Sequence, residues 1–377
     1  MLQVLEVISD QNIGGAGRLL INRIKNTDRT QYHITVIIPK ESMLLDLLKR
    51  ENVNVIEING AKNRSFDLKC FFKFLKIIKC LSPDIINCHA SMSARLAAKM
   101  LGVRVKIFTR HCDFPIKSFL KIPILRVALG FFNNYISDGA IAVSYSAKHN
   151  LIDLGVSEKK IKVIINGSQP QRKFSKEEND AFKKKENIPQ KMTIVGIFAR
   201  LEKYKDHMTF INAAKVLENE KCFFIIVGTG NEENNLKNYV RSLGIDNKVR
   251  FVGFVEDVTP WLNITDINVN CSVGTETSSL ALSEGMSIGV PAIVSDYAGN
   301  KYMVKDGENG MIFPQRNCFV LAKKIECLMN NKAFYNKLSA NALKRFENEL
   351  NAKNMTEKTE NYYQEMYNKK TCKNTDL

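Results

Sequence analysis

The sequence predicts an α/β protein made of two Rossmann-like halves, and three observations predict it. The chain has 377 residues, and at about 150 residues per domain this length predicts two sizeable domains. Short β-branched runs alternate with longer segments of helical period, as in parallel sheets covered by helices. With 45% hydrophobic residues, each half can bury its own core, which excludes a disordered chain.

The first half contains seven short runs that are typical of buried strands. They are residues 4–8, 32–38, 53–58, 85–88, 105–109, 139–143 and 161–165. Between them, apolar residues recur at helical spacing in residues 19–25, 44–50, 68–80, 93–101 and 146–154,. Gly155 follows the last of these segments and is placed to end it,. We therefore expect residues 1–167 to form one doubly wound domain.

A polar, lysine-rich and acid-rich stretch at residues 168–190 predicts a linker,. A second α/β series follows, and it predicts a second Rossmann-like domain over residues 191–350. Its strands are expected near 193–198, 223–227, 249–253, 267–271, 292–295 and 311–313, and its helices at 206–218, 232–243, 257–264 and 280–288. Residues 351–377 read as a helix and tail, and we expect this helix to pack back on the first domain. Two such halves usually hold a ligand in a central cleft.

The net charge of +16 is the most unusual feature of the composition. It favours nucleic acid, an anionic membrane surface or phosphorylated substrates as partners. The nine cysteines form no CxxC pair or Cys/His group, so they indicate neither a disulfide framework nor a zinc site. The N-terminus lacks a basic leader, and no run of 18 uncharged apolar residues occurs,. We therefore expect a cytoplasmic protein that is able to contact a membrane from its inner face.

A glycine-rich loop follows the first expected strand. It contains Gly14, Gly15 and Gly17, and glycines there let the backbone approach an anion at a helix N-terminus. The loop is not a full GxGxxG, because Leu20 replaces the closing glycine. A tight strand-to-helix turn without a ligand explains the same residues equally well.

The most informative segment lies late in the chain, between the strand at 267–271 and the helix at 280–288. A polar loop there carries Glu276, and the helix carries Glu284 among apolar neighbours. The two acids are expected at different depths of one pocket at the carboxyl edge of a sheet, with Glu284 toward the interior. The alternative makes Glu276 a helix N-terminal acid and Glu284 part of a solvated face.

The spacing of these acids resembles the E-x7-E signature of retaining GT-B glycosyltransferases of the GT4 type. Further segments follow in the order of that family, and the resemblance covers nearly the whole chain. They are the glycine loop, Asn166-Gly167, the run Val195 to Leu201 with Lys205, Gly289-Val290-Pro291, and Asp306 to Gly310. The resemblance implies a GT-B fold and a transferase that acts in surface polysaccharide synthesis, such as lipopolysaccharide or capsule.

The resemblance also assigns residues of the second domain to a nucleotide diphosphate sugar. Arg200 and Lys205 would bind its diphosphate, Glu284 the ribose hydroxyls and Glu276 the sugar. Two fixed cations stabilise the leaving diphosphate without a metal ion. Backbone N–H groups of Thr277, Ser278, Ser279 and Leu280 would add to this site. The chain departs from the family at Thr277 and Ser279, where glycines are common.

In the first domain, His111 matches the family position that lines the donor-sugar side. Without the resemblance, a structural histidine is the ordinary interpretation. His89 is a weaker candidate, which packs or shapes the acceptor side. No first-domain carboxylate is clearly placed for double displacement, and Asp113 is the nearest one,. Retention by same-face attack, which the resemblance implies, then needs only orientation and charge stabilisation. We expect neither a cofactor nor a metal ion, since no DxD motif is needed.

Two basic amphipathic segments favour contact with an anionic membrane. Residues 115–132 interleave cations with large apolar residues, as interfacial helices do. Lys69, Lys73, Lys76 and Lys79 form a second basic set on a helix rich in phenylalanine. Core helices with basic outer edges are an equally common explanation. The family's lipid-linked glycan acceptors approach this domain, which favours the membrane.

Three other classes of protein remain as alternatives. A nucleotide-sugar epimerase would share the two-domain fold but use no acceptor. A basic nucleic-acid-binding protein would explain the charge, but the chain shows no helix-turn-helix and no aromatic platforms among arginines, and we expect no nucleic-acid partner. A dehydrogenase is disfavoured by the incomplete dinucleotide motif.

Overall fold

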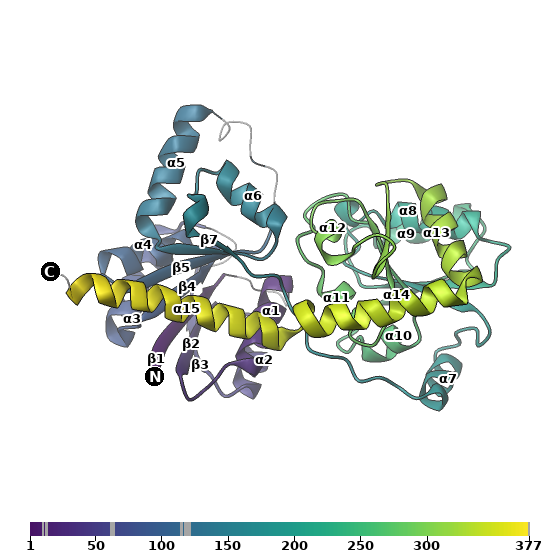
Figure 1. Cartoon of the computed structure of the whole chain (residues 1–377), viewed down its shortest axis with the longest axis horizontal. Helices are drawn as coiled ribbons and strands as arrows, with labels where there is room; N and C mark the ends of the chain where they lie inside the picture. The colour runs from purple at the N-terminus through teal and green to yellow at the C-terminus, as the bar shows by residue number, and fades with distance from the viewer. Residues whose placement is uncertain (10, 12–13, 61–64, 114–115, 117–121, 376–377) are drawn as a thin grey trace. The chain divides into compact units, whose positions relative to one another are not determined.

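The computed structural model describes residues 1–9, 11, 14–60, 65–113, 116 and 122–375. The chain divides into two compact units. Unit 1 contains Met1–Gly167 and Ala352–Leu377, and unit 2 contains Ser168–Asn351. Each unit has a parallel sheet with helices on both faces (Figure 1). The predicted α/β class with two Rossmann-like domains is therefore confirmed.

Unit 1 is built on a seven-stranded sheet of order β3-β2-β1-β4-β5-β6-β7. Its strands are β1 (Leu2–Ile8), β2 (Tyr32–Pro39), β3 (Asn54–Ile58), β4 (Ile85–His89), β5 (Val105–Arg110), β6 (Gly139–Ala142) and β7 (Ile161–Val163). Every pair is parallel, and strand order reverses between β1 and β4. The carboxyl ends of β1 and β4 are thus the expected ligand edge of this sheet.

Alternation along β1 gives the sheet of unit 1 two different faces, because successive side chains point to opposite sides. The connecting helices are α1 (Gly15–Asn26), α2 (Leu44–Arg50), α3 (Leu68–Leu81), α4 (Met92–Met100), α5 (Pro123–Ile136) and α6 (Tyr145–Asp153). Leu5 and Val7 pack in a core with α3 and α4. Ile8 packs instead with α1 and α2. Glu6 lies on the same face as Ile8, and it is fully buried there.

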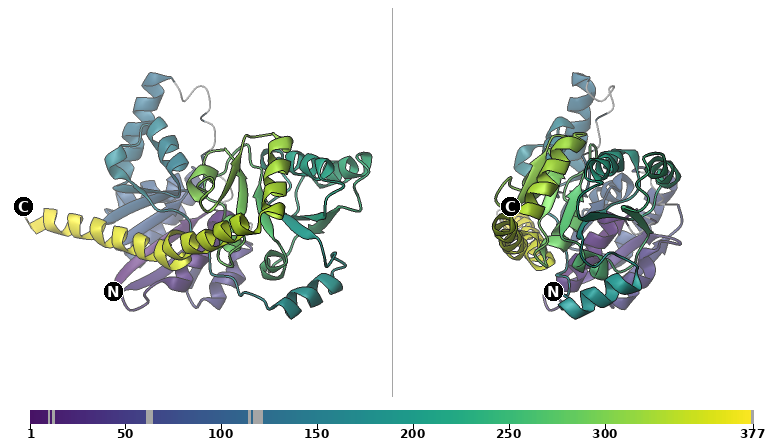
Figure 2. Two further views of the ribbon diagram at one scale, coloured as in Figure 1. Left: turned by 45° about the vertical axis from the view of Figure 1, so that its right-hand side comes forward. Right: turned by 90° about the vertical axis from the view of Figure 1, so that its right-hand side faces the viewer.

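The C-terminal helix α15 (Ala352–Thr375) belongs to unit 1 although 184 residues of unit 2 precede it in the chain. It packs on α1 and beside β5 (Figure 1; Figure 2). Tyr363 is the largest fully buried side chain of the described residues and anchors this helix. Its docking face includes the buried Thr356 and Thr359, so no strong apolar stripe marks this face in the sequence.

Unit 2 has a six-stranded sheet of order β10-β9-β8-β11-β12-β13. Its strands are β8 (Thr193–Phe198), β9 (Cys222–Val227), β10 (Val249–Gly253), β11 (Ile267–Asn270), β12 (Ala292–Ser295) and β13 (Gly310–Phe313). Its helices are α7 (Lys176–Lys185), α8 (His207–Val216), α9 (Glu233–Ser242), α10 (Thr259–Asn263), α11 (Leu280–Met286), α12 (Asn300–Met303), α13 (Cys318–Asn330) and α14 (Lys332–Arg345). Strand order reverses between β8 and β11, which marks the ligand edge of this sheet.

The expectation that residues 168–190 are a linker is wrong for much of this segment. Residues 176–185 form α7, whose Phe182 packs edge-on against Trp261 at 5.1 Å between ring centroids. Ile188 joins the same buried cluster. Ser175 and Glu178 form a capping box at the start of α7, and this S-x-x-E pattern is a helix signal visible in the sequence.

Candidate active site

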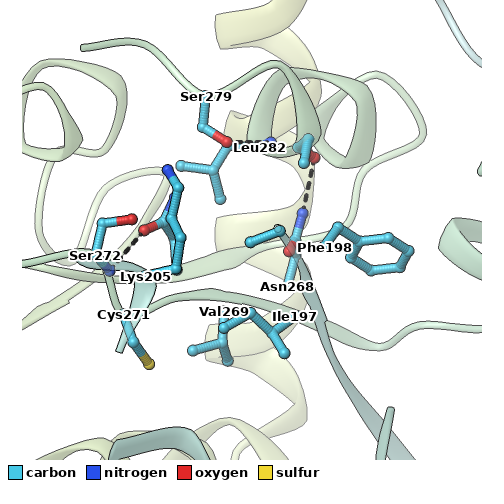
Figure 3. A pocket seen from close by; sticks show the side chains of 12 residues that line it. Ile197, Phe198, Lys205, Asn268, Val269, Cys271, Ser272, Ser279 and Leu282 are labelled. Carbon is cyan, nitrogen blue, oxygen red and sulfur yellow. Dashed lines mark hydrogen bonds between the residues drawn. The ribbon is translucent and has the colours of Figure 1, made fainter. Parts of the chain in front are cut away.

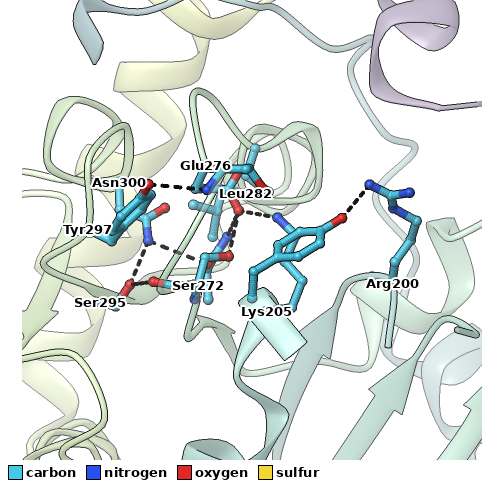
Figure 4. A network of polar contacts seen from close by, with 12 residues as sticks. Arg200, Lys205, Ser272, Glu276, Leu282, Ser295, Tyr297 and Asn300 are labelled. Carbon is cyan, nitrogen blue, oxygen red and sulfur yellow. Dashed lines mark hydrogen bonds and ion pairs between the residues drawn. The ribbon is translucent and has the colours of Figure 1, made fainter. Parts of the chain in front are cut away.

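A buried ion pair lies at the ligand edge of unit 2. Glu276, in the loop after β11, is only 5% exposed. Its Oε2 accepts hydrogen bonds from Lys205 Nζ at 2.6 Å, Ser272 Oγ at 2.8 Å and Asn270 Nδ2 at 3.0 Å (Figure 4). Three donors converge on one carboxylate oxygen, so this side chain is held in a single orientation.

The environment keeps Glu276 ionised. Burial by itself raises the pKa of a carboxyl group, but the charge of Lys205 and the hydrogen bonds from Asn270 and Ser272 outweigh it, so the pKa of Glu276 lies below its ordinary value,. A buried carboxylate with a fixed cation is a stable arrangement only while both partners are present.

The loop of Glu276 is tied to the loop that follows β12. Gly299 N–H donates to the Glu276 carbonyl at 3.0 Å, and a Cβ at Gly299 would lie 1.7 Å from the Thr277 carbonyl oxygen. Asn300 Nδ2 donates to Ser295 Oγ at 3.0 Å, and Ser295 Oγ donates to the Ser272 carbonyl at 2.6 Å (Figure 4). Only glycine fits at position 299, which explains the Ala-Gly-Asn sequence there.

The sequence analysis missed these supporting residues. Asn270 ends the buried strand β11 and Ser272 follows it, and buried polar groups require partners,. The two asparagines in the otherwise apolar run at 267–271, Asn268 and Asn270, are the signal that would have found Asn270. Asn300 gave no such signal, because its side-chain partners, Asn270 and Ser295, come from two other segments of the chain.

Arg200 and Lys205 lie on either side of a tyrosine that the sequence analysis did not consider. Arg200 Nη2 donates to Tyr204 Oη at 2.6 Å (Figure 4). The Tyr204 ring centroid lies 6.0 Å from the Arg200 guanidinium carbon and 5.6 Å from Lys205 Nζ. Arg200 is exposed and Lys205 is half-buried. The two cations thus stand on one short segment after β8, with different access to solvent.

A small pocket lies beside Lys205 (Figure 3). Side chains of β8 and β11 form its floor, and Ser272, Ser279 and Leu282 contribute to its wall. Ser279 caps α11, since its Oγ accepts the Leu282 N–H at 3.4 Å. The pocket is therefore formed by the strand ends that the fold brings to the ligand edge.

The remaining residues of the E-x7-E segment occupy different depths. Thr277 and Ser278 are buried, whereas Ser279 and Leu280 are half-buried. Glu284 is half-buried on α11, so the deeper acid is Glu276 and not Glu284 as expected. The reason is the loop, which turns Glu276 back under Lys205, while α11 directs Glu284 partly outward.

The glycine loop of unit 1 combines two kinds of glycine. A Cβ at Gly17 would lie 2.6 Å from a Leu44 side-chain carbon, so Gly17 permits close packing of α1 on α2. A Cβ at Gly15 would meet nothing within 4 Å. Gly14 is the extended N-cap residue of α1 without a side-chain cap. Residues 12–13 of this loop lie outside the described residues.

His111 lies just beyond β5 and stacks on His89, with 4.9 Å between ring centroids. His89 Nδ1 and His111 Nε2 are 2.6 Å apart, and His89 Nε2 lies 2.8 Å from Glu6 Oε2. Burial, together with His89 and Arg110, holds the pKa of His111 well below its ordinary value. His111 is therefore neutral, and the sequence analysis missed its connection to Glu6.

The described residues contain neither a metal-binding cluster nor a helix that could span a membrane. No group of three or more His, Cys, Asp or Glu side chains in that part of the chain is arranged to hold a metal ion. Among the helices that the structure describes, none combines the length and apolar character needed to cross a bilayer.

Comparisons with known proteins agree on one family. The model of glycosyl transferases group 1 matches residues 178–345, and that of Glycosyltransferase Family 4 matches residues 13–172. An Escherichia coli UDP-Gal:alpha-D-GlcNAc-diphosphoundecaprenol alpha-1,3-galactosyltransferase is 26% identical, over 94% of both chains. The Campylobacter jejuni GalNAc-alpha-(1->4)-GalNAc-alpha-(1->3)-diNAcBac-PP-undecaprenol alpha-1,4-N-acetyl-D-galactosaminyltransferase is 27% identical, over 92% of this chain and 94% of that one.

Solved structures share the fold over nearly the whole chain. Anabaena HepE in complex with UDP has a TM-score of 0.84 at 20% identity and covers 97% of this chain and 100% of its own. A glycosyltransferase from Rickettsia africae has a TM-score of 0.83 at 21% identity and covers 97% and 98%. The two Rossmann-like sheets, the E-x7-E segment and the two family models together show that the chain belongs to the GT-B glycosyltransferases of the GT4 type.

Proposed function

We propose that this glycosyltransferase moves a sugar from a nucleotide diphosphate sugar to a lipid-linked glycan acceptor in bacterial surface polysaccharide synthesis. The reaction proceeds with retention of configuration and without a metal ion. The observation that carries this proposal is the Lys205–Glu276 pair beside Arg200 at the ligand edge of unit 2. Relatives named for undecaprenol diphosphate acceptors support the acceptor class.

The cations act on the leaving group. As the glycosidic bond breaks, the diphosphate gains negative charge, and Arg200 and Lys205 stabilise it by charge-assisted hydrogen bonds. Glu276 Oε2 holds Lys205 in place, and Glu276 Oε1 accepts a hydrogen bond from a hydroxyl of the donor sugar. The Glu284 carboxylate accepts hydrogen bonds from the ribose hydroxyls. Backbone N–H groups of Thr277, Ser278, Ser279 and Leu280 add to the diphosphate site, and Gly14, Gly15 and His111 line the unit 1 side of the substrates.

Retention follows from same-face attack in this proposal. The leaving phosphate takes the proton of the acceptor hydroxyl, and the enzyme supplies orientation and charge stabilisation. A double displacement would instead need a carboxylate beside the anomeric carbon. Of the acids considered, Glu276 is engaged by Lys205, Ser272 and Asn270, which leaves it poorly suited to act as a nucleophile.

A thermal-shift screen tests the donor class. UDP, UDP-glucose, UDP-galactose, UDP-N-acetylglucosamine and GDP-mannose are added separately to the full chain, and a ligand that binds only the folded state raises Tm. We expect one sugar nucleotide to raise Tm in the wild type and to have much less effect in Arg200→Ala. No shift with any of these compounds contradicts the donor assignment.

Product analysis tests the reaction itself. With the selected donor and an undecaprenyl diphosphate sugar as acceptor, we expect free nucleotide and a product whose new anomeric bond keeps the donor configuration by NMR. An inverted product contradicts the mechanism. Interconversion of the donor without release of nucleotide would instead identify an epimerase.

An exposed basic and apolar face of unit 1 supports membrane contact. Helix α3 packs on α4, and α4 packs on α5, so the three lie along one side of the sheet (Figure 1). In α5 only Gly130 and Ile136 are buried, while Ile124, Val127 and Phe131 are each at least 70% exposed. Lys69, Lys73, Lys76 and Lys79 of α3 are all exposed. Residues 114–115 and 117–121 of the basic segment lie outside the described residues.

We propose that this face, made by α3, α4 and α5, lies on an anionic bilayer. Apolar side chains would enter the interface while lysines meet the lipid phosphates. The test is co-sedimentation with vesicles of phosphatidylcholine with and without phosphatidylglycerol. We expect binding only to the anionic vesicles, weakened by salt and by Phe131→Asp, with the exposed Phe319→Asp of unit 2 as the matched control. Equal binding by both variants and the wild type contradicts this assignment.

A further inference from the structure

Glu6 is a charged side chain at the centre of unit 1 with no exposure to solvent. Its Oε1 forms an ion pair with Arg23 Nη2, 2.5 Å away, and accepts a hydrogen bond from Tyr363 Oη at 2.9 Å. Its Oε2 contacts His89 Nε2 at 2.8 Å and accepts from Asn87 Nδ2 at 3.1 Å. Four polar side chains from three elements, α1, β4 and α15, meet on one carboxylate, which lies two residues before the end of β1.

The protonation of this cluster follows from its contacts. Burial acts to raise the pKa of Glu6, but the charge of Arg23 and the hydrogen bonds from His89 and Tyr363 outweigh it and lower that pKa,. Glu6 is therefore a carboxylate and only an acceptor. The proton between Glu6 and His89 must then reside on His89 Nε2.

The second nitrogen of His89 faces His111. With a single proton, held on Nε2 by the Glu6 carboxylate, His89 has an acceptor at Nδ1,. The 2.6 Å contact then requires that His111 Nε2 carries the proton and donates.

We propose that Glu6 and His89 are positioning residues for His111. They fix its ring and its tautomer so that Nε2–H points to His89 and Nδ1 is presented as a hydrogen-bond acceptor to a hydroxyl of the substrate. This inference rests on the proposed function, in which His111 faces the donor sugar. The same logic orients metal-binding histidines through a carboxylate behind the ring, but here the ligand is a sugar hydroxyl.

The C-terminal helix contributes to this relay, by which we mean the contacts that run from Glu6 through His89 to His111. Tyr363 reaches from α15 to Glu6 across 357 residues of sequence. Its neighbour Tyr362 makes an equivalent hydrogen bond, at 3.2 Å, to the backbone carbonyl of Lys160, which lies outside the cluster. The helix therefore has two buried tyrosines that differ mainly in the group that accepts the hydrogen bond of the hydroxyl.

The first test is direct observation of the tautomer. The full chain has five histidines, so long-range ¹H–¹⁵N NMR of ¹⁵N-histidine-labelled protein at pH 7.5 can resolve each ring. We expect the Nε2–H tautomer for both His89 and His111. An Nδ1–H tautomer at His111 overturns the proposal, and the measurement needs no knowledge of the donor.

The second test removes the nitrogens of His89 but keeps a ring. In His89→Phe the stack on His111 can persist while the hydrogen bonds are lost. We expect a mixed tautomer at His111 and a fall in kcat/KM of about 10- to 100-fold with the donor that the thermal-shift screen selects. His89→Gln has an amide able to donate to Glu6 and accept from His111, so we expect partial recovery of both readouts.

The tyrosine pair separates positioning from stability. Tyr363→Phe and Tyr362→Phe each remove one buried hydroxyl, and we expect similar losses in Tm. Only Tyr363→Phe should also lower kcat/KM and broaden the tautomer signals of His111. If folded His89→Phe keeps the wild-type tautomer and kinetics, the relay is disproved. If no sugar nucleotide binds or reacts with the wild type, the proposed function fails, while the tautomer experiment still decides the relay.

Discussion

Lys205 Nζ lies 2.6 Å from Glu276 Oε2, and the side chains are only 15% and 7% exposed. The family resemblance implies separate partners for these residues, a diphosphate for the lysine and a sugar for the glutamate. In the structure the two side chains form one ion pair, in which the Glu276 carboxylate fixes the position of the Lys205 ammonium group. The energetic consequences of altering either residue should therefore depend on the other.

A double-mutant cycle measures this dependence. Lys205→Met and Glu276→Gln should each lower turnover by about 100-fold, the scale of losing one fixed group that stabilises developing charge. The double variant should be little worse than either single one, because each change already removes the pair. Additive losses, with kcat falling by the product of the two factors, would show that the residues act independently.

Arg200 should contribute mainly to donor binding, since it is exposed and held by Tyr204. We expect Arg200→Ala to raise the Kd for the donor about 10-fold or more, as for a lost charge-assisted contact, and Tyr204→Phe to raise it less. Isothermal titration measures both. Arg241→Ala, which removes another exposed arginine of unit 2, is the control and should bind normally.

Metal independence is tested by chelation. Two fixed cations are proposed to stabilise the leaving diphosphate. We therefore expect the turnover rate in about 5 mM EDTA to equal the turnover rate with added Mg²⁺ or Mn²⁺. Initial rates with the selected donor provide the measurement. Loss of activity in EDTA that either cation restores would require a metal in the mechanism.

His207 should make unit 2 sensitive to acid. Burial, with a smaller effect of Lys205, lowers its pKa to about 4, and neither ring nitrogen has a hydrogen-bond partner among the described residues. Below its unfolded pKa of about 6.5 the unfolded chain binds a proton that the folded chain excludes. Stability should therefore fall between about pH 6.5 and pH 4, by about 3 kcal/mol in all.

Urea unfolding at several pH values compares wild type with His207→Leu for this effect. The variant has no titrating group at this position, so its free energy of unfolding should change less over the same range. Parallel pH curves for the two proteins would show that His207 does not titrate as its burial implies.

Gly15 and Gly17 of the glycine loop in unit 1 should respond differently to substitution by alanine. At Gly17 a Cβ meets Leu44 at 2.6 Å, so Gly17→Ala should cost about 1–3 kcal/mol of stability through overpacking. At Gly15 the space is open, so Gly15→Ala should leave Tm nearly unchanged. If the loop backbone contacts an anion as proposed, Gly15→Ala should still reduce activity. Normal activity in folded Gly15→Ala would favour a purely structural turn.

Much of the fold follows from local patterns. The β-branched runs and helical spacing place the strands of both sheets within a few residues of their observed ends, because parallel strands that are buried on both faces must be apolar throughout,. The pattern failed at α7, a helix with mixed charges, because its Phe182 and the Ile188 that follows the helix find their apolar partners in other segments of unit 2. Composition in that segment resembles a linker, and the Ser175–Glu178 capping box is the sequence signal that distinguishes it from one,.

The sequence by itself determined the fold class, the family and the chemical type of the residues at the ligand edge of unit 2. The tertiary structure alone decided which of those residues meet. Lys205 and Glu276 are 71 positions apart, and Tyr363 and Glu6 are 357 apart. Local propensity and periodicity act over a few residues, whereas these contacts depend on strand order and on the return of α15 to unit 1. An acidic residue among apolar neighbours indicates in the sequence that a buried carboxylate needs partners, but only the three-dimensional fold determines which residues those partners are.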